Sequence, residues 1–173
     1  DLCKIKIINK VLGSGFFCRI PFPDKDHPLP VLFTSNHVIG NRDLEIGKII
    51  NFTMDDDKIE KIITIDETRK TYTNEEFDVT MIEIKPEDKM ESFLEIDDEL
   101  YGDKTEEELK SIYEDQEIYV IQYPGDKYCS HSEGIVKKIN KSEINHLCST
   151  EEGSSGGAIL LLLNFKVIGI HKG

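Results

Sequence analysis

Alanine is almost absent from this chain, with Ala158 the single example in 173 residues, whereas isoleucine and valine are frequent. Because alanine is the strongest helix former and β-branched side chains favour extended backbone, this usage disfavours helices and favours strands. The apolar residues fall in short runs separated by turn-forming residues. The first predicted strands are Lys4–Val11, Phe16–Ile20, Val31–Ser35, Ile49–Met54, Ile59–Ile65 and Val79–Ile84; a second series is Glu117–Tyr123, Gly134–Ile139, Ile144–Leu147, Ala158–Leu163 and Lys166–His171. Many short strands at regular spacing are typical of an all-β sandwich or barrel.

An acidic, turn-rich segment separates the two series of strands. Within it, Thr105 and Glu108 form a capping-box pattern that predicts one short helix ending at Tyr113. We therefore expect a first β domain over residues 1–85, a linker over 86–115 and a second β domain over 116–173. We expect the acidic runs at 55–57 and 106–108 to be solvated faces, not metal sites.

The chain carries 21 Lys and Arg against 34 Asp and Glu, a formal net charge of −13. Such a charge repels phosphates at long range, which argues against a nucleic acid or an anionic membrane as the partner. No apolar stretch reaches the length of a transmembrane helix, and no signal peptide opens the chain. From these features we expect a cytoplasmic protein.

The four cysteines, Cys3, Cys18, Cys129 and Cys148, contain no CxxC pair. A chain of this length can bury a large core without staples, so we favour free thiols in a reducing compartment. One alternative is a structural zinc site, in which Cys129 and His131 meet His146 and Cys148 across a hairpin. The spacing is not a usual one for zinc, so we expect neither a metal nor another cofactor.

Three short segments carry residues suited to nucleophilic catalysis. Ser155 lies in Gly153–Gly157, a glycine-rich turn that leads directly into an apolar strand, where backbone N–H groups can converge on an oxyanion. His37 follows the end of a predicted strand and has a side chain that titrates near neutral pH. Asp78 stands at the mouth of another apolar strand, where a carboxylate needs a partner. Each residue alone also fits an ordinary turn, but the three together indicate a proton-relay site.

The segments around these residues, together with Gly13–Phe17 and Val167–His171, resemble the trypsin/chymotrypsin-like peptidase superfamily over nearly the whole chain. The resemblance implies two antiparallel six-stranded β-barrels of the chymotrypsin type, the second lacking its last strand here. It implies that Ser155 is the nucleophile, His37 the general base and then acid, and Asp78 the carboxylate that orients His37. It also implies that the main-chain N–H groups of Gly153 and Ser155 form the oxyanion hole.

The same resemblance makes Gly13-Ser14-Gly15 a turn into the strand before His37. Ser154 occupies the position where secreted digestive members carry an aspartate that pairs with a new N-terminus. Activation by that charge pair is therefore not expected in this chain.

The primary specificity pocket in this superfamily is walled by residues before the nucleophile and by a later strand, here Ser149, Thr150 and His171. Thr150 with His171 resembles glutamyl endopeptidases and the picornavirus-type proteases that prefer Gln. A hydroxyl and an imidazole can both donate hydrogen bonds to a carboxylate or an amide, so we expect a polypeptide substrate cleaved after Glu or Gln. Glu151 and Glu152 and the acidic surface slightly favour Gln. The alternative function is a protease-fold binding or regulatory module with little or no activity.

Overall fold

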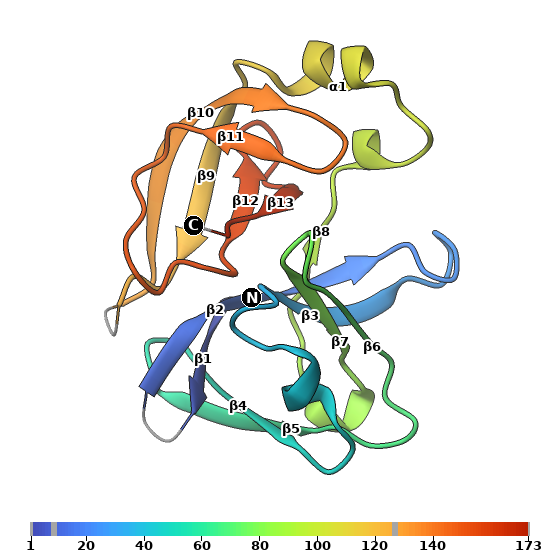
Figure 1. The fold of residues 1–173 in the computed structure, drawn as a ribbon, viewed down its shortest axis with the longest axis vertical. Coiled ribbons are helices and arrows are strands. Elements are labelled where there is room, and N and C mark those ends of the chain that lie inside the picture. The colour runs from blue at the N-terminus through green and yellow to red at the C-terminus, as the bar shows by residue number, and fades with distance from the viewer. Residues whose placement is uncertain (1, 8–9, 126–127, 173) are drawn as a thin grey trace.

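The computed structural model describes residues 2–7, 10–125 and 128–172. Its strands form two curled, largely antiparallel sheets, one from each half of the chain, which stack as two lobes (Figure 1). The N-terminal sheet has the order β5-β4-β1-β2-β3-β7-β6, with β8 pairing in parallel with β2. Its strands are β1 (Leu2–Ile7), β2 (Lys10–Ile20), β3 (Leu29–Thr34), β4 (Ile49–Met54), β5 (Ile59–Thr64), β6 (Thr71–Asn74), β7 (Val79–Glu83) and β8 (Leu94–Glu95).

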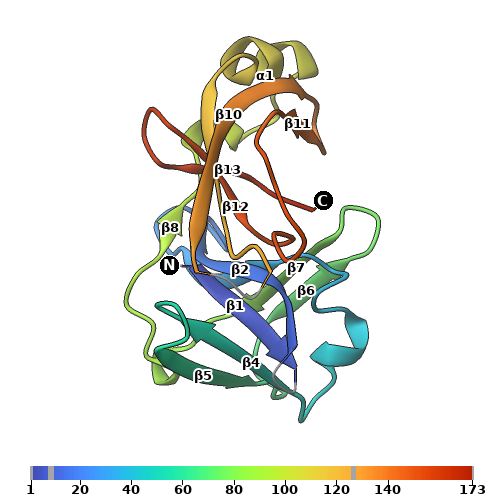
Figure 2. The ribbon, with the colours of Figure 1, turned by 90° about the vertical axis from the view of Figure 1, so that its left-hand side faces the viewer.

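The C-terminal sheet has the order β11-β10-β9-β12-β13. Its strands are β9 (Glu117–Gln122), β10 (Ser130–Ile139), β11 (Ile144–His146), β12 (Ala158–Leu161) and β13 (Val167–Ile170). Helix α1 (Glu106–Tyr113) lies at the outer end of this lobe, away from the N-terminal sheet (Figures 1 and 2). Three short 3₁₀ turns complete the described elements, at Asn41–Leu44, Pro86–Asp88 and Asp98–Leu100. None of the helices in the described part of the chain is long and apolar enough to cross a membrane.

The fold class predicted from the sequence is confirmed, down to the single short helix and its cap. The Thr105 hydroxyl accepts the N–H of Glu108 at 3.2 Å, and the Glu108 carboxylate accepts the N–H of Thr105 at 2.7 Å. These bonds pair two of the donors that a helix start leaves open.

Several local predictions were wrong. The single strand expected over Lys4–Val11 is divided between β1 and β2, which pair antiparallel. The expected turn at Gly13-Ser14-Gly15 is continuous strand within β2, because Gly13 and Gly15 both pair with β1. The short strands β6 and β8 were not predicted, because their polar residues carry no apolar run.

The acidic turn at 55–57 is only partly a solvated face. The Asp57 carboxylate bonds the ammonium groups of Lys4 at 2.6 Å and Lys6 at 2.7 Å. These two cations, with the Thr53 hydroxyl, hold the pKa of Asp57 well below its usual range. The sequence pattern did not predict the ion pair of Asp57 with Lys4, because Lys4, which is buried, comes from a strand that is distant along the chain.

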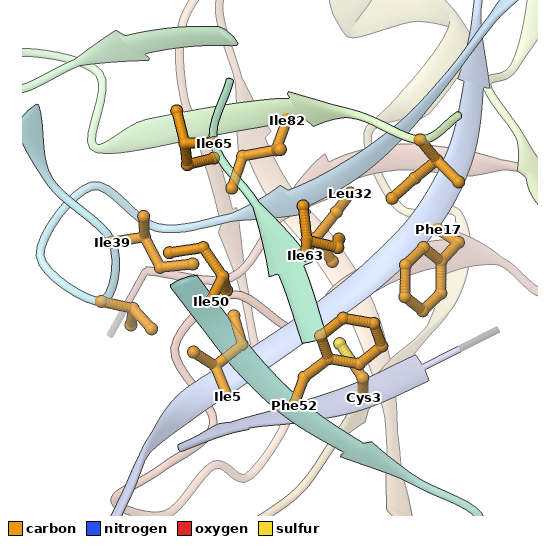
Figure 3. Packing of buried hydrophobic residues seen from close by; sticks show 12 residues of the cluster. Cys3, Ile5, Phe17, Leu32, Ile39, Ile50, Phe52, Ile63, Ile65 and Ile82 are labelled. Carbon is orange, nitrogen blue, oxygen red and sulfur yellow. The ribbon is translucent and has the colours of Figure 1, made fainter. Parts of the chain in front are cut away.

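Each lobe has its own apolar core. The core of the N-terminal lobe packs between its curled strands, as Figure 3 shows, and includes Cys3, Ile5, Phe17, Leu32, Ile39, Ile50, Phe52, Ile63, Ile65 and Ile82. The core of the C-terminal lobe combines strand residues with Leu109 and Tyr113 of α1. The helix therefore serves to close the open end of the second sheet.

A third apolar cluster joins the two lobes. It takes Phe16 and Cys18 from β2 and Ala158, Leu160 and Val167 from the C-terminal sheet. Alternate residues of β2 thus face different cores, which explains why Phe16 and Phe17 are both fully buried. This shared cluster places the strand that follows the glycine-rich turn directly against the N-terminal lobe.

Candidate active site

His37 lies in the turn that follows β3, and Asp78 is the last residue of the turn between β6 and β7. The Asp78 carboxylate accepts two hydrogen bonds from His37, one from the ring Nδ1 at 2.7 Å and one from the backbone N–H at 2.9 Å. A carboxylate on Nδ1 fixes that nitrogen as the proton donor, so Nε2 is left as the basic nitrogen. The structure thus brings together two of the three predicted relay residues.

The backbone of Asp78 has a φ of +51°, which a non-glycine residue seldom adopts. The turn is held in this shape by neighbours of His37. Asn36 donates to the Thr73 hydroxyl at 2.6 Å, Thr73 and Thr80 share a hydrogen bond of 2.6 Å, and the Thr80 hydroxyl donates to the Ile39 carbonyl oxygen at 2.7 Å. These bonds tie the hairpin β6–β7 to the His37 turn and so set the geometry of the pair.

Ser155 lies in the turn before β12, and its main chain is fixed against β2. The N–H of Ser14 donates to the carbonyl oxygen of Ser155 at 2.7 Å. A Cβ atom added at Gly13 would meet both Val38 Cγ2, at 2.6 Å, and the Ser155 carbonyl oxygen, at 2.9 Å. Ser155 and the residue that follows His37 therefore lie against the same glycine, so the serine and the histidine occupy one neighbourhood.

The Ser155 hydroxyl has its closest polar contact at the carbonyl oxygen of Lys172, 3.5 Å away. Among the described residues it makes no hydrogen bond to His37. The histidine ring is about half exposed, with 51% of its side chain accessible, so its Nε2 edge is open to a substrate or a proton.

The turn around Ser155 requires two of its glycines. Gly156 has a φ of +88°, and a Cβ there would lie 2.0 Å from the Ser14 carbonyl oxygen. Gly153 has a φ of +91°, and a Cβ there would lie 2.7 Å from the backbone nitrogen of Gly125. A side chain at either position would therefore clash with backbone and strain the turn.

The two backbone N–H groups predicted to form the oxyanion hole belong to Gly153 and Ser155. Neither donates a hydrogen bond to another described residue, whereas the neighbouring N–H groups of Ser154, Gly156 and Gly157 are all paired. Unpaired backbone donors beside a serine are the chemical requirement for holding a developing oxyanion.

Of the predicted pocket residues, Ser149 and Thr150 precede this turn in the chain, and His171 is bonded to it. His171 is buried, with its N–H on the Gly157 carbonyl oxygen at 2.8 Å and its carbonyl oxygen accepting the N–H of Gly156 at 2.7 Å. The Ser149 carbonyl oxygen accepts from the Gln122 amide at 3.4 Å. Thr150 is partly buried, and its hydroxyl has no hydrogen bond within the described residues.

Three residues near the site were not predicted from the sequence. Ser14 bonds the glycine-rich turn through its main chain and its hydroxyl. Gln122 lies behind the turn on β9, and His146 on β11 bonds the ring of His171. The sequence carries no signal that β2 extends back through Ser14, and nothing in it pairs residue 146 with residue 171.

The residues of the alternative zinc site are placed differently from that hypothesis. His131 packs edge-on against the Tyr119 ring, with centroids 5.2 Å apart, while His146 lies beside Val136, five residues further along β10. No group of three or more His, Cys, Asp or Glu side chains suited to a metal occurs in the described residues. All four cysteines are free thiols.

A histidine–aspartate pair beside a serine with open main-chain donors, between two curled β-sheets, is the arrangement of chymotrypsin-type peptidases. The sequence profile of the trypsin-like peptidase domain matches residues 13–170, so the chain belongs to that family. A search of curated proteins found no match.

Several solved structures share the fold at low sequence identity. A serine endoprotease from Yersinia pestis aligns with a TM-score of 0.65 at 15% identity, covering 99% of this chain and 52% of its own. The Rv3671c protease of M. tuberculosis in an inactive form aligns at 0.63 with 18% identity, covering 99% and 77%. The HtrA-type protease AlgW with a decapeptide aligns at 0.61 with 16% identity, covering 99% and 54%. The chain thus spans about half the length of the Yersinia protein.

Proposed function

We propose that this domain is a serine endopeptidase that hydrolyses polypeptides through an acyl-enzyme, with Ser155 as nucleophile, His37 as general base and acid, and Asp78 as the orienting carboxylate. The observation that supports this most strongly is the double hydrogen bond from His37 to the Asp78 carboxylate, next to the fixed backbone of Ser155. A binding module of the same fold has no need of this bond geometry.

The chemistry follows from the tautomer of His37. With the Nδ1 proton held by Asp78, Nε2 can take the hydroxyl proton of Ser155 as the oxygen attacks the scissile carbonyl. The N–H groups of Gly153 and Ser155 would bind the resulting oxyanion. The imidazolium then gives its proton to the leaving amine, and water releases the acyl group by the same steps.

The same proposal places Ser149, Thr150 and His171 in the pocket for the side chain before the cleaved bond and gives it a preference for Glu or Gln. His171 supports this because its backbone is bonded to Gly156 and Gly157, the two residues after the nucleophile. A buried imidazole this close to the reacting serine can recognise a polar side chain.

A fluorophosphonate probe tests the reaction directly. The protein should react at one site, and Ser155→Ala should abolish labelling while the adjacent Ser154→Ala variant is still labelled. Replacement of Ser155 or His37 should lower turnover by roughly 10⁴-fold or more. Labelling that persists in Ser155→Ala would contradict Ser155 as the nucleophile. A folded protein that never reacts would favour the binding or regulatory module instead.

A peptide library tests the pocket independently of the labelling experiment. Cleavage should concentrate after Glu and Gln. A profile dominated by Arg, Phe or Ala before the cleaved bond would contradict the assignment of Thr150 and His171. The cytoplasmic location expected from the sequence stays a prediction.

A further inference from the structure

Two histidine rings, one of them on the predicted pocket residue His171, lie in contact with each other. His146, at the end of β11, and His171, just after β13, approach with Nε2 and Nδ1 3.3 Å apart and ring centroids 5.4 Å apart. The Nδ1 of His146 lies 3.1 Å from the backbone N–H of Cys148. His171 is 5% exposed, whereas His146 is half-buried.

These contacts determine which nitrogen carries the proton in each ring. A backbone N–H can only donate, so Nδ1 of His146 is an acceptor and the proton of this neutral ring is on Nε2. That Nε2–H then donates to Nδ1 of His171, which places the proton of His171 on its own Nε2. The chain of donors runs one way, from the main chain at Cys148 through His146 to His171.

The outer nitrogen of His171 is available to a ligand. Its Nε2 has no hydrogen bond to a described residue. This nitrogen is also not fully buried, so a ligand can reach it. Burial and the neighbouring His146 lower the pKa of His171 to about 4, so its ring is neutral at pH 7.

No charged side chain is bonded to either ring in the described residues. The nearest charged residues along the chain are Glu143, three positions before His146, and Lys172, directly after His171, and these two pair with each other at 3.0 Å. His171 therefore offers a neutral N–H donor, and the ammonium next to it along the chain, on Lys172, is already paired with a carboxylate.

Gln122 lies next to the same glycine-rich turn. This side chain is 4% exposed, its amide nitrogen bonds the Ser149 carbonyl oxygen, and its Oε1 is buried without a hydrogen-bond donor. It packs against the turn after the nucleophile, since its Cβ would lie 3.3 Å from a Cβ at Gly157. Because Oε1 of Gln122 is fully buried, a substrate does not reach it in this conformation, and the residue acts only by packing against the turn.

We propose that His146 is a positioning residue that holds His171 as a neutral Nε2–H donor, so that the pocket prefers the carboxamide of glutamine to the carboxylate of glutamate. The carboxamide oxygen accepts the His171 proton. A glutamate carboxylate that binds there would lose its hydration without gaining a cation as partner, and this desolvation costs binding free energy. This inference rests on the proposed peptidase function and narrows its substrate class.

The kinetic test uses two peptides that differ only in Gln or Glu before the cleaved bond, at pH 7. The kcat/KM ratio should favour Gln by about tenfold or more. His146→Leu, which removes the donor to His171, should reduce that preference by about tenfold. His146→Gln, whose amide can donate to the same nitrogen, should retain it, and His131→Leu, on the far part of β10, should match the parent.

A preference for Glu in the parent, or a His146→Leu variant with the parent ratio, would overturn the proposal. A second readout does not depend on turnover. Nitrogen-15 NMR of the histidine rings in Ser155→Ala should show His171 neutral at pH 7 with its proton on Nε2. Adding His146→Leu should mix the two tautomers, while adding His146→Gln should not.

A charged His171, or a proton on Nδ1, would refute the inference even in a protein that cleaves no peptide. Absence of fluorophosphonate labelling, with the predicted His171 tautomer present, would instead refute the peptidase function alone. The two failures are therefore distinguishable.

Discussion

Ser14 provides the sharpest test of how the two lobes build the site. Its side chain is fully buried; the hydroxyl donates to the Gly153 carbonyl oxygen at 3.0 Å and accepts the N–H of Tyr123 at 2.9 Å. Both partners belong to the C-terminal lobe, whereas Ser14 lies on β2 of the N-terminal lobe. This one hydroxyl therefore holds the turn that carries the proposed oxyanion donor.

Ser14→Ala removes both bonds and leaves the Tyr123 N–H without an acceptor. Tyr123 is 3% exposed, so the unpaired donor should cost about 1–3 kcal/mol and the lost bond to Gly153 about 1 kcal/mol more. The free energy of unfolding should fall by about 2–4 kcal/mol in urea titrations. The loosened Gly153 N–H should lower kcat by about tenfold to a hundredfold, with KM little changed.

Ser35→Ala is the matched control. Ser35 is equally buried, but its hydroxyl makes only one long contact, 3.5 Å to the His171 carbonyl oxygen. Its loss should cost less than about 1 kcal/mol. If Ser14→Ala proves as stable as Ser35→Ala and keeps the parent kcat, the turn is held by its own glycines and the reasoning fails.

Three further variants or conditions test other parts of the structure. Asp78→Asn should lower kcat/KM by about 10⁴-fold at pH 7, because the amide cannot fix the His37 tautomer; a loss under tenfold in peptide hydrolysis would contradict this. Asp88→Ala should lower the free energy of unfolding by about 3–5 kcal/mol in urea, because it strands the buried Arg69 guanidinium, which it bonds at 2.7 and 3.1 Å. Because the pKa of His171 is about 4 in the fold and higher in the unfolded chain, stability should fall as the pH drops from about 6.5 to 4. His171→Gln should lose less over that interval, and an equal loss would assign the acid sensitivity to other groups.

Local patterns in the sequence were enough to predict an all-β chain and to propose a relay of His37, Asp78 and Ser155, of which the structure shows the bond between His37 and Asp78. The glycine-rich turn before an apolar strand indicated Ser155. Asp78, at the start of another apolar strand, indicated a carboxylate that needs a hydrogen-bond partner. The partnership of His37 with Asp78 joins residues 41 positions apart, yet each has a local signature. Such sites are predictable because their residue types are unusual in their immediate surroundings.

The strands that the sequence did not predict lack such a local signature. β6 and β8 are short and contain polar or mixed residues, so their pairing with β7 and β2 comes from neighbours and not from their own composition. The division of the first predicted strand into β1 and β2 likewise depends on the antiparallel pairing of the two segments, which an apolar pattern does not mark. Strand pairing is a property of two segments, so one segment cannot specify it alone.

By itself, the sequence determined an all-β chain in two halves with a short capped helix between them, because alanine scarcity, short apolar runs and capping residues act within a few positions. The tertiary structure alone decided that Ser14 braces the Ser155 turn, that Gln122 has a buried unpaired acceptor, and that His146 donates to His171. Those relations require segments up to 139 residues apart to meet. A hydrogen bond forms only when its two atoms are about 3 Å apart. Which distant residues come that close is decided by the folded chain, so the local sequence pattern does not predict these bonds.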